Sequence, residues 1–260
     1  MNTQPLARQL KRAVTALLFA VCINAHCIVS DVDNRKVDTH ITAVTEDWPP
    51  LNYLTKEGKI AGYVTEKVAE ILEHAELSYD MRLFPWVRAY EMALTQPNVL
   101  IFTVYRTVDR DKDFHWICPV APSIQLHAFA LASRTDLNID TLDDLRGYVI
   151  GVSRNDYPFD YLVQNGFQEH KQLDMSANND VNLQKLLSKR VDFTIGTWKE
   201  MQVRLNRFGH EKTKLNRFLQ IDVGHDWPLC LALSKSTPAN IVKRIQTAHQ
   251  AILGMSYKQR

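Results

Sequence analysis

Two arginines four positions apart, Arg106 and Arg110, are the residues best suited to bind a charged group. A guanidinium presents a planar set of N–H donors that meets a carboxylate through two parallel, charge-assisted hydrogen bonds. Either side chain could therefore bind an anion such as a carboxylate. The competing interpretation is that Arg110 is a solvated surface residue, because it lies in the charged run 109–113.

Acids and bases are present without the spacing of a known catalytic motif. Glu46, Asp156 and nine histidines are candidates, but the sequence contains no HExxH, no GxSxG and no phosphate-binding loop. It also lacks a CxxC pair and the Cys/His spacing of a structural zinc site. With 31 basic and 29 acidic residues, the chain has no charge excess of the kind that attracts nucleic acid. We expect no catalysis, no cofactor and no bound metal.

An alternation of strands and helices must position these residues. Apolar or β-branched runs predict strands at 40–45, 77–83, 99–104, 148–152, 191–195 and 228–233. Apolar residues at helical spacing predict helices within 64–75, at 86–94, 181–187 and 197–208, and after Pro238. Strands that alternate with helices are typical of parallel α/β sheets, and two such sets predict two lobes.

The N-terminal segment and the cysteines indicate the compartment. Three basic residues precede an apolar run over 13–23 that is too short to span a bilayer, which is the pattern of a secretory signal peptide. We therefore expect an exported, soluble protein that begins near residue 31. Two cysteines remain in it, Cys118 and Cys230, and both a disulfide and two buried free thiols fit them.

Several motifs follow one another in a characteristic order. ITAVTEDWPPLNYLTKEGKIAGYVTEKVAE (41–70) runs from a strand through an aromatic-proline loop and a glycine turn into a helix. NVLIFTVYRTVDRDKDF (98–114) is a strand followed by T-x-x-R. LDDLRGYVIGVSRND (142–156) and LLSKRVDFTIGTW (186–198) are two further strand-loop segments. In this order the chain resembles the family 3 extracellular solute-binding proteins, the receptors of polar amino-acid ABC importers.

The resemblance implies an α/β, two-lobed fold of the type II periplasmic-binding-protein class, hinged by two crossing strands. Residues 1–30 are then the signal peptide, 31–120 and 226–260 form lobe 1, and 121–225 form lobe 2. It also implies a periplasmic monomer that holds a small ligand in the cleft between the lobes and serves an ABC permease. Open α/β sheets favour ligand sites at the carboxyl ends of their parallel strands, and hinged lobes close over the ligand.

The resemblance assigns several ligand contacts to lobe 1. Arg110 falls at the position of the family's carboxylate-binding arginine, which makes it a candidate anion clamp. Arg106 lies four residues before that position and is a candidate second anion contact or an alternative clamp. Trp48 and Trp86 fall at the aromatic positions that enclose the ligand side chain, and an ordinary core role is the alternative for both. Thr103 and Tyr105 end the strand that supplies a hydroxyl and a backbone carbonyl to the ligand.

On lobe 2 the resemblance points to a loop and to a missing charge. Asn155, Asp156 and Tyr157 align with a loop whose backbone amides bind the ligand carboxylate. Thr197 stands where amino-acid receptors carry the aspartate that pairs with the ligand ammonium, and Glu46 is a candidate replacement. Burying an ammonium without a fixed anion is costly. The sequence therefore predicts a small anionic or amino-acid-like ligand, and favours an anionic group over an ordinary free α-amino acid.

Two other functions stay open at this point. A sensory module that reports to a membrane sensor uses the same cleft, so the residues do not separate it from an import receptor. A dehydratase-type enzyme on the same fold is the less favoured alternative, because no acid/base motif accompanies the candidate acids.

Overall fold

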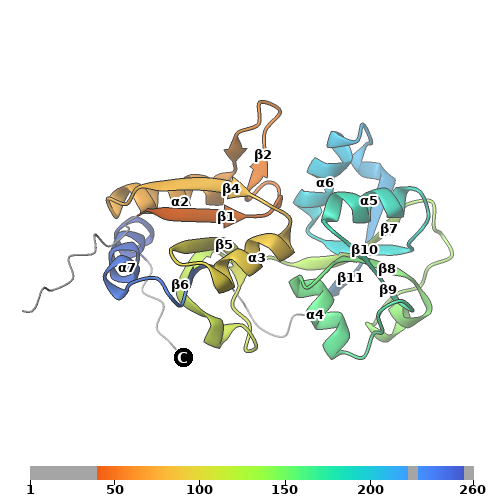
Figure 1. Ribbon diagram of the computed structural model, residues 1–260. Coiled ribbons are helices and arrows are strands. Elements are labelled where there is room, and N and C mark those ends of the chain that lie inside the picture. Colours follow the sequence, from red (N-terminus) through yellow and green to blue (C-terminus); the bar gives the residue numbers. More distant parts are fainter. Residues whose placement is uncertain (1–39, 222–227, 255–260) are drawn as a thin grey trace, which may run out of the picture. The chain divides into compact units, whose positions relative to one another are not determined.

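The computed structural model describes residues 40–221 and 228–254, which contain two five-stranded β-sheets flanked by helices (Figure 1). The first sheet consists, in spatial order, of β4 (Tyr79–Leu83), β1 (Ile41–Thr45), β5 (Val99–Tyr105), β12 (Leu229–Ser234) and β6 (Phe114–Ala121). The second consists of β11 (Leu215–Ile221), β7 (Leu126–Leu131), β10 (Phe193–Gly196), β8 (Ile150–Ser153) and β9 (Leu173–Ser176). A separate small sheet pairs β2 (Tyr53–Leu54) with β3 (Ile60–Ala61).

Six α-helices and three short 3-10 helices complete the described part of the chain. The α-helices are α2 (Tyr63–His74), α3 (Trp86–Thr95), α4 (Tyr157–Gln164), α5 (Asn179–Leu187), α6 (Trp198–Arg207) and α7 (Ala239–Leu253). The 3-10 helices are η1 (Asp111–Asp113), η2 (Asp143–Gly147) and η3 (Lys212–Lys214). No helix in residues 40–221 and 228–254 is both long enough and apolar enough to cross a membrane.

Both sheets are mixed. In the first, β1 pairs in parallel with β4 and β5, whereas β12 pairs antiparallel with β5 and β6. In the second, β8 pairs in parallel with β9 and β10, whereas β7 pairs antiparallel with β10 and β11. Loops that leave the parallel strands of one sheet emerge at the same edge, and this gathers residues that are distant in the sequence.

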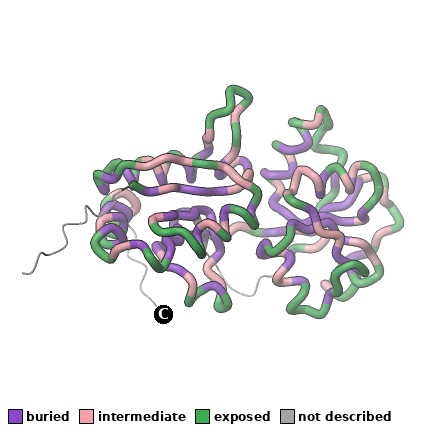
Figure 2. Tube along the Cα trace, in the orientation of Figure 1, coloured by how far each residue is buried: buried purple, intermediate pink, exposed green. Residues whose placement is uncertain are grey.

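The central strands are apolar on both faces, so helices cover both faces of each sheet. All residues of β5 are buried, as Figure 2 shows along this strand. Leu100 packs in one cluster with α2 and α7, and its neighbour Ile101 packs in another with α3. In the second sheet Phe129 packs with α5 and α6. Phe193 belongs to the cluster that includes Leu162 of α4. Because successive side chains of a strand point to opposite faces of the sheet, neighbouring residues such as Leu100 and Ile101 pack against different helices.

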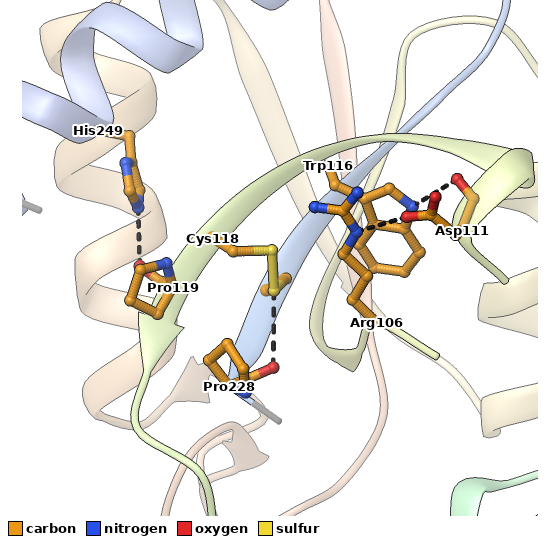
Figure 3. Close-up of a disulfide and its surroundings, with 8 residues drawn as sticks. Arg106, Asp111, Trp116, Cys118, Pro119, Pro228 and His249 are labelled. Atoms are coloured by element: carbon orange, nitrogen blue, oxygen red, sulfur yellow. Dashed lines mark hydrogen bonds and ion pairs between the residues drawn. A yellow bond between two sulfur atoms is a disulfide. The ribbon is translucent and has the colours of Figure 1, made fainter. Parts of the chain in front are cut away.

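The chain passes between the two sheets twice. It leaves β6 and reaches β7 across residues 122–125, and it leaves β11 at Ile221 and reaches β12 at Leu229. The sequence placed the second crossing near 222–229, of which 222–227 lie outside the described residues. Cys118 in β6 and Cys230 in β12 form a disulfide with their Cα atoms 4.6 Å apart (Figure 3). Of the two alternatives for these cysteines, the structure thus has the disulfide.

The predicted fold class is confirmed, and the strands and helices expected from periodicity are present with slightly different ends. The sequence analysis missed α4, the short strands β2 and β3, and the strands β6, β7, β9 and β11. Of these, β9 and β11 are the edges of the second sheet, where polar and exposed residues interrupt the apolar pattern. The predicted signal peptide, 1–30, lies outside the described residues, and the lobe boundaries stay a prediction.

Candidate ligand-binding site

A cavity lies at the carboxyl ends of strands from both sheets. β1 leads directly into Glu46, β8 leads through a short turn to Asp156, and β10 ends at Gly196. The empty space between its walls is about 440 Å³, part of it open to solvent. Its lining consists of Glu46, Trp48, Trp86, Thr103, Tyr105, Arg110, Leu126, Asp156, Tyr157, Pro158, Asn179, Ile195, Gly196 and Glu200.

Aromatic rings form much of the wall. The ring centroid of Tyr105 lies 5.9 Å from that of Trp48 and 4.7 Å from that of Tyr157. The indole Nε1 of Trp86 donates a 2.6 Å hydrogen bond to the carbonyl oxygen of Asn155. Burial raises the pKa of Tyr105, so its hydroxyl stays neutral. This hydroxyl is buried and has no hydrogen-bond partner among the described residues, which leaves it to a ligand.

Arg110 is buried in the cavity wall and already has partners. One terminal nitrogen donates to Asp160 Oδ2 at 2.7 Å and to the carbonyl of Asn155 at 3.2 Å. The guanidinium carbon lies 5.1 Å from the ring centre of Trp86 and 5.3 Å from that of Tyr90. Asp160 therefore neutralises the cation that the sequence analysis assigned to a ligand carboxylate.

Glu200 is the fully buried acid of the site, and four donors surround its carboxylate. Oε2 accepts from Trp48 Nε1 at 3.1 Å and from the Thr197 amide at 3.3 Å. Oε1 accepts from Asn179 Nδ2 at 3.1 Å and from Arg204 Nε at 2.9 Å. Thr197 in turn accepts from the Glu200 amide, so the two residues form a capping box at the start of α6. The hydrogen-bonding capacity of the Glu200 carboxylate is thus met by donors of the protein itself.

Glu46 and Asp156 are the two acids of the cavity without an ion-pair partner in the described residues. The Asp156 carboxylate accepts from the Phe159 amide at 2.9 Å and caps α4. Burial raises the pKa of Asp156 to about 7, and the Asp160 and Glu200 carboxylates add to this effect. Burial also raises the pKa of Glu46 to about 8, with repulsion from Asp156 and Glu200 as further causes and attraction by Arg204 opposing them. Both carboxyls hold protons at pH values where exposed acids are ionised.

Hydrogen bonds that cross from one sheet to the other surround the cavity. Trp48 reaches Glu200, and Trp86 and Arg110 both reach the carbonyl of Asn155. Asp47 pairs with Arg204 at 3.1 Å and with Arg207 at 2.7 Å. The residues that enclose the cavity therefore also hold its two sides together.

The structure brings most of the predicted site residues together. Arg106 instead pairs with Asp111 at 2.5 Å and lies near the ring of Trp116, outside the cavity lining (Figure 3). Asn155 contributes its carbonyl oxygen to the hydrogen bonds that cross between the two sides of the cavity. Thr197 caps α6 and does not line the cavity. Those that line the cavity are Glu46, Trp48, Trp86, Thr103, Tyr105, Arg110, Asp156 and Tyr157.

Glu200 and Asn179 are the polar lining residues that the sequence analysis missed. The T-x-x-E spacing of Thr197 and Glu200 is a capping-box signal, and it was visible in the sequence. It places Glu200 in the first turn of a helix that starts at the end of β10. No comparable signal marks Asn179, whose role depends on its contact with Glu200.

Solved structures of binding proteins share this fold at low sequence identity. A histidine kinase sensor domain similar to periplasmic binding proteins has a TM-score of 0.73 and 19% identity, and the match covers 85% of this chain and 92% of that one. An ancestral arginine-binding protein bound to arginine has a TM-score of 0.72 and 14% identity, with coverages of 84% and 94%. A periplasmic binding protein of Salmonella typhimurium with high arginine specificity has a TM-score of 0.68 and 12% identity, with coverages of 83% and 94%. These likenesses show the type II periplasmic-binding-protein fold.

Sequence comparison gives a family as well as a fold. No curated protein sequence matches the chain. The family model described as NMT1/THI5 like matches residues 103–251, which is more than half of the chain and includes the end of β5, Arg110 and all of the second sheet. The chain belongs to the NMT1/THI5-like family.

Proposed function

We propose that this protein is a periplasmic solute-binding protein that captures one small ligand in the cavity and presents it to an ABC importer. The observation that carries the proposal is a cavity enclosed by residues of both sheets and surrounded by hydrogen bonds that cross between them. Closure of two lobes over a ligand produces this arrangement. A neighbouring structure described as the substrate-binding protein of an amino acid ABC transporter, with 13% identity and a TM-score of 0.68, supports the transport role.

The charges of the cavity bear on the predicted anionic or amino-acid-like ligand. The ammonium of an amino-acid-like ligand has more support than an anionic group, because Glu46 and Asp156 are available to it. The arginine-binding neighbours likewise hold a ligand that carries a cationic group. A purely anionic ligand has less support, because Arg106 and Arg110 both pair with protein carboxylates.

Ligand binding is tested by thermal shift and tryptophan fluorescence on the exported chain with a panel of amino acids, amines and organic acids. A ligand stabilises the native state by about 2.7 kcal/mol at a hundred times its dissociation constant. We expect at least one compound to raise the melting temperature and to change the emission, since Trp48 and Trp86 line the cavity.

Two variants locate the response. The double variant Trp48→Phe/Trp86→Phe should lose most of the fluorescence change, and Trp116→Phe should keep it because Trp116 lies outside the lining. The opposite pattern would place the ligand elsewhere. A panel that leaves both the melting temperature and the emission unchanged would contradict the proposal.

A sensory role is the second candidate, because a histidine kinase sensor domain is among the similar structures. Deletion of the gene separates the two roles. Loss of ligand uptake with normal ligand-dependent transcription favours the importer. Normal uptake with loss of the transcriptional response favours the sensor.

A further inference from the structure

The lining of the cavity has more negative groups than positive ones. Glu46, Asp156 and Glu200 contribute carboxyls, and Arg110 is the one basic residue of the lining. Arg204 pairs with Glu200, and Asp160 pairs with Arg110. Glu46 and Asp156 form no ion pair among the described residues. The guanidinium of Arg110 still attracts Asp156 and opposes the rise in its pKa, whereas the Asp160 and Glu200 carboxylates add to that rise.

The Glu46 carboxyl lies among charged groups, most of which are acids. Its side chain is half-buried, and among the described residues its carboxyl accepts no hydrogen bond and forms no ion pair. The charges that face it are the carboxylates of Asp156, Glu200 and Asp47 and the guanidinium of Arg204. A partly buried charge is stabilised by a partner, and around an ionised Glu46 three carboxylates oppose the one guanidinium that faces it, so a ligand cation would stabilise the site.

The other groups of the cavity suit an organic cation. The hydroxyl oxygen of Tyr105 is buried, lacks a partner among the described residues and can accept from a ligand N–H. Tyr105 lies against Trp48 and Tyr157, and Trp86 forms a further part of the wall. Faces of such rings attract ammonium and guanidinium groups.

A ligand carboxylate has a poor environment in the same space. The guanidinium of Arg110 is held by Asp160 at 2.7 Å and by the Asn155 carbonyl. The side chain of Asp156, in the same lining, is itself an acid and caps α4. A second anion placed there meets like charge and displaces an existing ion pair.

From these contacts we infer that the ligand is a small organic cation, an amine or a guanidine without a carboxylate, whose charged nitrogen is held by Glu46, Asp156 and the Tyr105 hydroxyl. This inference rests on the proposed function and names the ligand class of that same site.

The protonation of Glu46 and Asp156 adds a measurable signature. Burial holds the pKa of Glu46 at about 8 and that of Asp156 at about 7. A cation favours the ionised carboxylates, so its binding releases protons near neutral pH. Its affinity therefore rises with pH between about 6 and 8, by up to about tenfold per pH unit for each proton released. An anionic ligand favours the protonated acids, and its affinity falls over the same range.

Isothermal titration calorimetry with matched probes tests the ligand class on the full exported chain. Agmatine and putrescine are the cationic probes, arginine and ornithine add a carboxylate to each, and glutarate is the anionic probe. We expect an amine to bind at least tenfold more tightly than its amino-acid parent and to release protons, measured in two buffers of different ionisation enthalpy. Tighter binding of the parent amino acid or of glutarate would overturn the inference and leave the proposed function standing. A failure of every probe and of the wider panel would overturn both.

Glu46→Gln tests the contact itself, with Glu66→Gln as its matched control. Glu66 is an exposed acid on α2, outside the cavity. We expect Glu46→Gln to weaken amine binding at least tenfold and to reduce proton release, and Glu66→Gln to change neither. Asp156→Asn serves as a second variant, because asparagine keeps the α4 cap while it removes the charge. Unchanged affinity and proton release in both cavity variants would overturn the inference.

Discussion

Arg204 is the residue on which most charges of the site converge. Its side chain is 1% exposed and contacts Glu200 at 2.9 Å, Asp47 at 3.1 Å and also Asp180. Asp47 follows β1 of the first sheet, whereas Glu200 and Asp180 belong to helices of the second. One buried guanidinium thus satisfies three acids, and it also orients the carboxylate that holds Trp48 in the cavity wall.

Arg204→Gln should destabilise the protein by about 3–5 kcal/mol, because it leaves the buried Glu200 carboxylate without its cation. Arg207→Gln is the matched control. Arg207 pairs with Asp47 and Asp180 as well, but its side chain is 32% exposed, so its loss should cost less than about 1 kcal/mol. Urea unfolding measures both. Equal losses in the two variants would mean that burial of Arg204 does not set the strength of its pairs.

Glu46 should make the stability of the unliganded protein depend on pH. Its carboxyl titrates near 4.5 in the unfolded chain and at about 8 in the folded protein, so the folded state binds the extra proton between these values. The free energy of unfolding contributed by this group therefore falls as pH rises from about 5 to about 8.

Urea unfolding at pH 5, 6.5 and 8 measures this dependence. Glu46→Gln removes the titrating group and should flatten the decline relative to the wild type, whereas the exposed Glu66→Gln should leave it in place. An unchanged slope in Glu46→Gln would show that the folded-state pKa of Glu46 is close to its ordinary value.

At the scale of elements, the loop after β1 depends on one close backbone approach. Gly62 precedes α2 with a φ of 125°, and the amides of Val64 and Thr65 donate to the carbonyl of Leu51. A Cβ at position 62 would lie 2.3 Å from the Leu51 oxygen. Glycine is therefore required for α2 to begin against the loop that carries Glu46 and Trp48.

Gly62→Ala should destabilise the protein by more than about 2 kcal/mol, since the methyl group meets backbone atoms as well as an unfavourable φ. Gly58→Ala is the control. Its φ is 78°, but a Cβ there meets nothing within 4 Å, so only the backbone strain of about 1–2 kcal/mol remains. Thermal or urea unfolding compares the two. A smaller loss for Gly62→Ala than for Gly58→Ala would contradict the close approach.

At the scale of the whole molecule, the disulfide links the two strands of the first sheet that are next to the crossings. Cys118 lies three residues before the end of β6, and Cys230 is the second residue of β12. The bond closes a loop with a sequence separation of 112 residues, and that loop contains the entire second sheet. Such a closure restricts the unfolded chain more than a local one does.

Cys118→Ala/Cys230→Ala should lower the free energy of unfolding by about 2–4 kcal/mol. A reducing agent should lower the stability of the wild type by a similar amount and leave the double variant unchanged. Urea unfolding with and without the reductant makes the comparison. A double variant as stable as the oxidised wild type would show that the bond contributes nothing to the folded state.

The sequence by itself determined the order of elements and the acids and aromatic residues at the strand ends. The β-branched run of β5 and the helical spacing in α2 are local patterns, and local patterns predict local structure. The resemblance to the family 3 solute-binding proteins, and not these local patterns, placed Glu46, Trp48, Trp86 and Asp156 near a site. The family 3 resemblance predicted the fold, which is confirmed, while the amino-acid ligand of that family stays a proposal for this chain.

Only the tertiary structure decided how the charged groups pair. Arg110 meets Asp160, 50 positions away, and Trp48 meets Glu200, 152 positions away. Trp48 and Arg110 lie in loops after strands of the first sheet, whereas Asp160 and Glu200 lie on helices next to the second sheet. The order of the strands and the two crossings bring these residues together. The sequence analysis assigned both arginines to an anionic ligand because their protein partners are not visible from spacing. With these partners assigned, Glu46 and Asp156 are the acids of the cavity lining that form no ion pair among the described residues. The fold decides which charged side chains pair, and it therefore decides the charge that the cavity presents to a ligand.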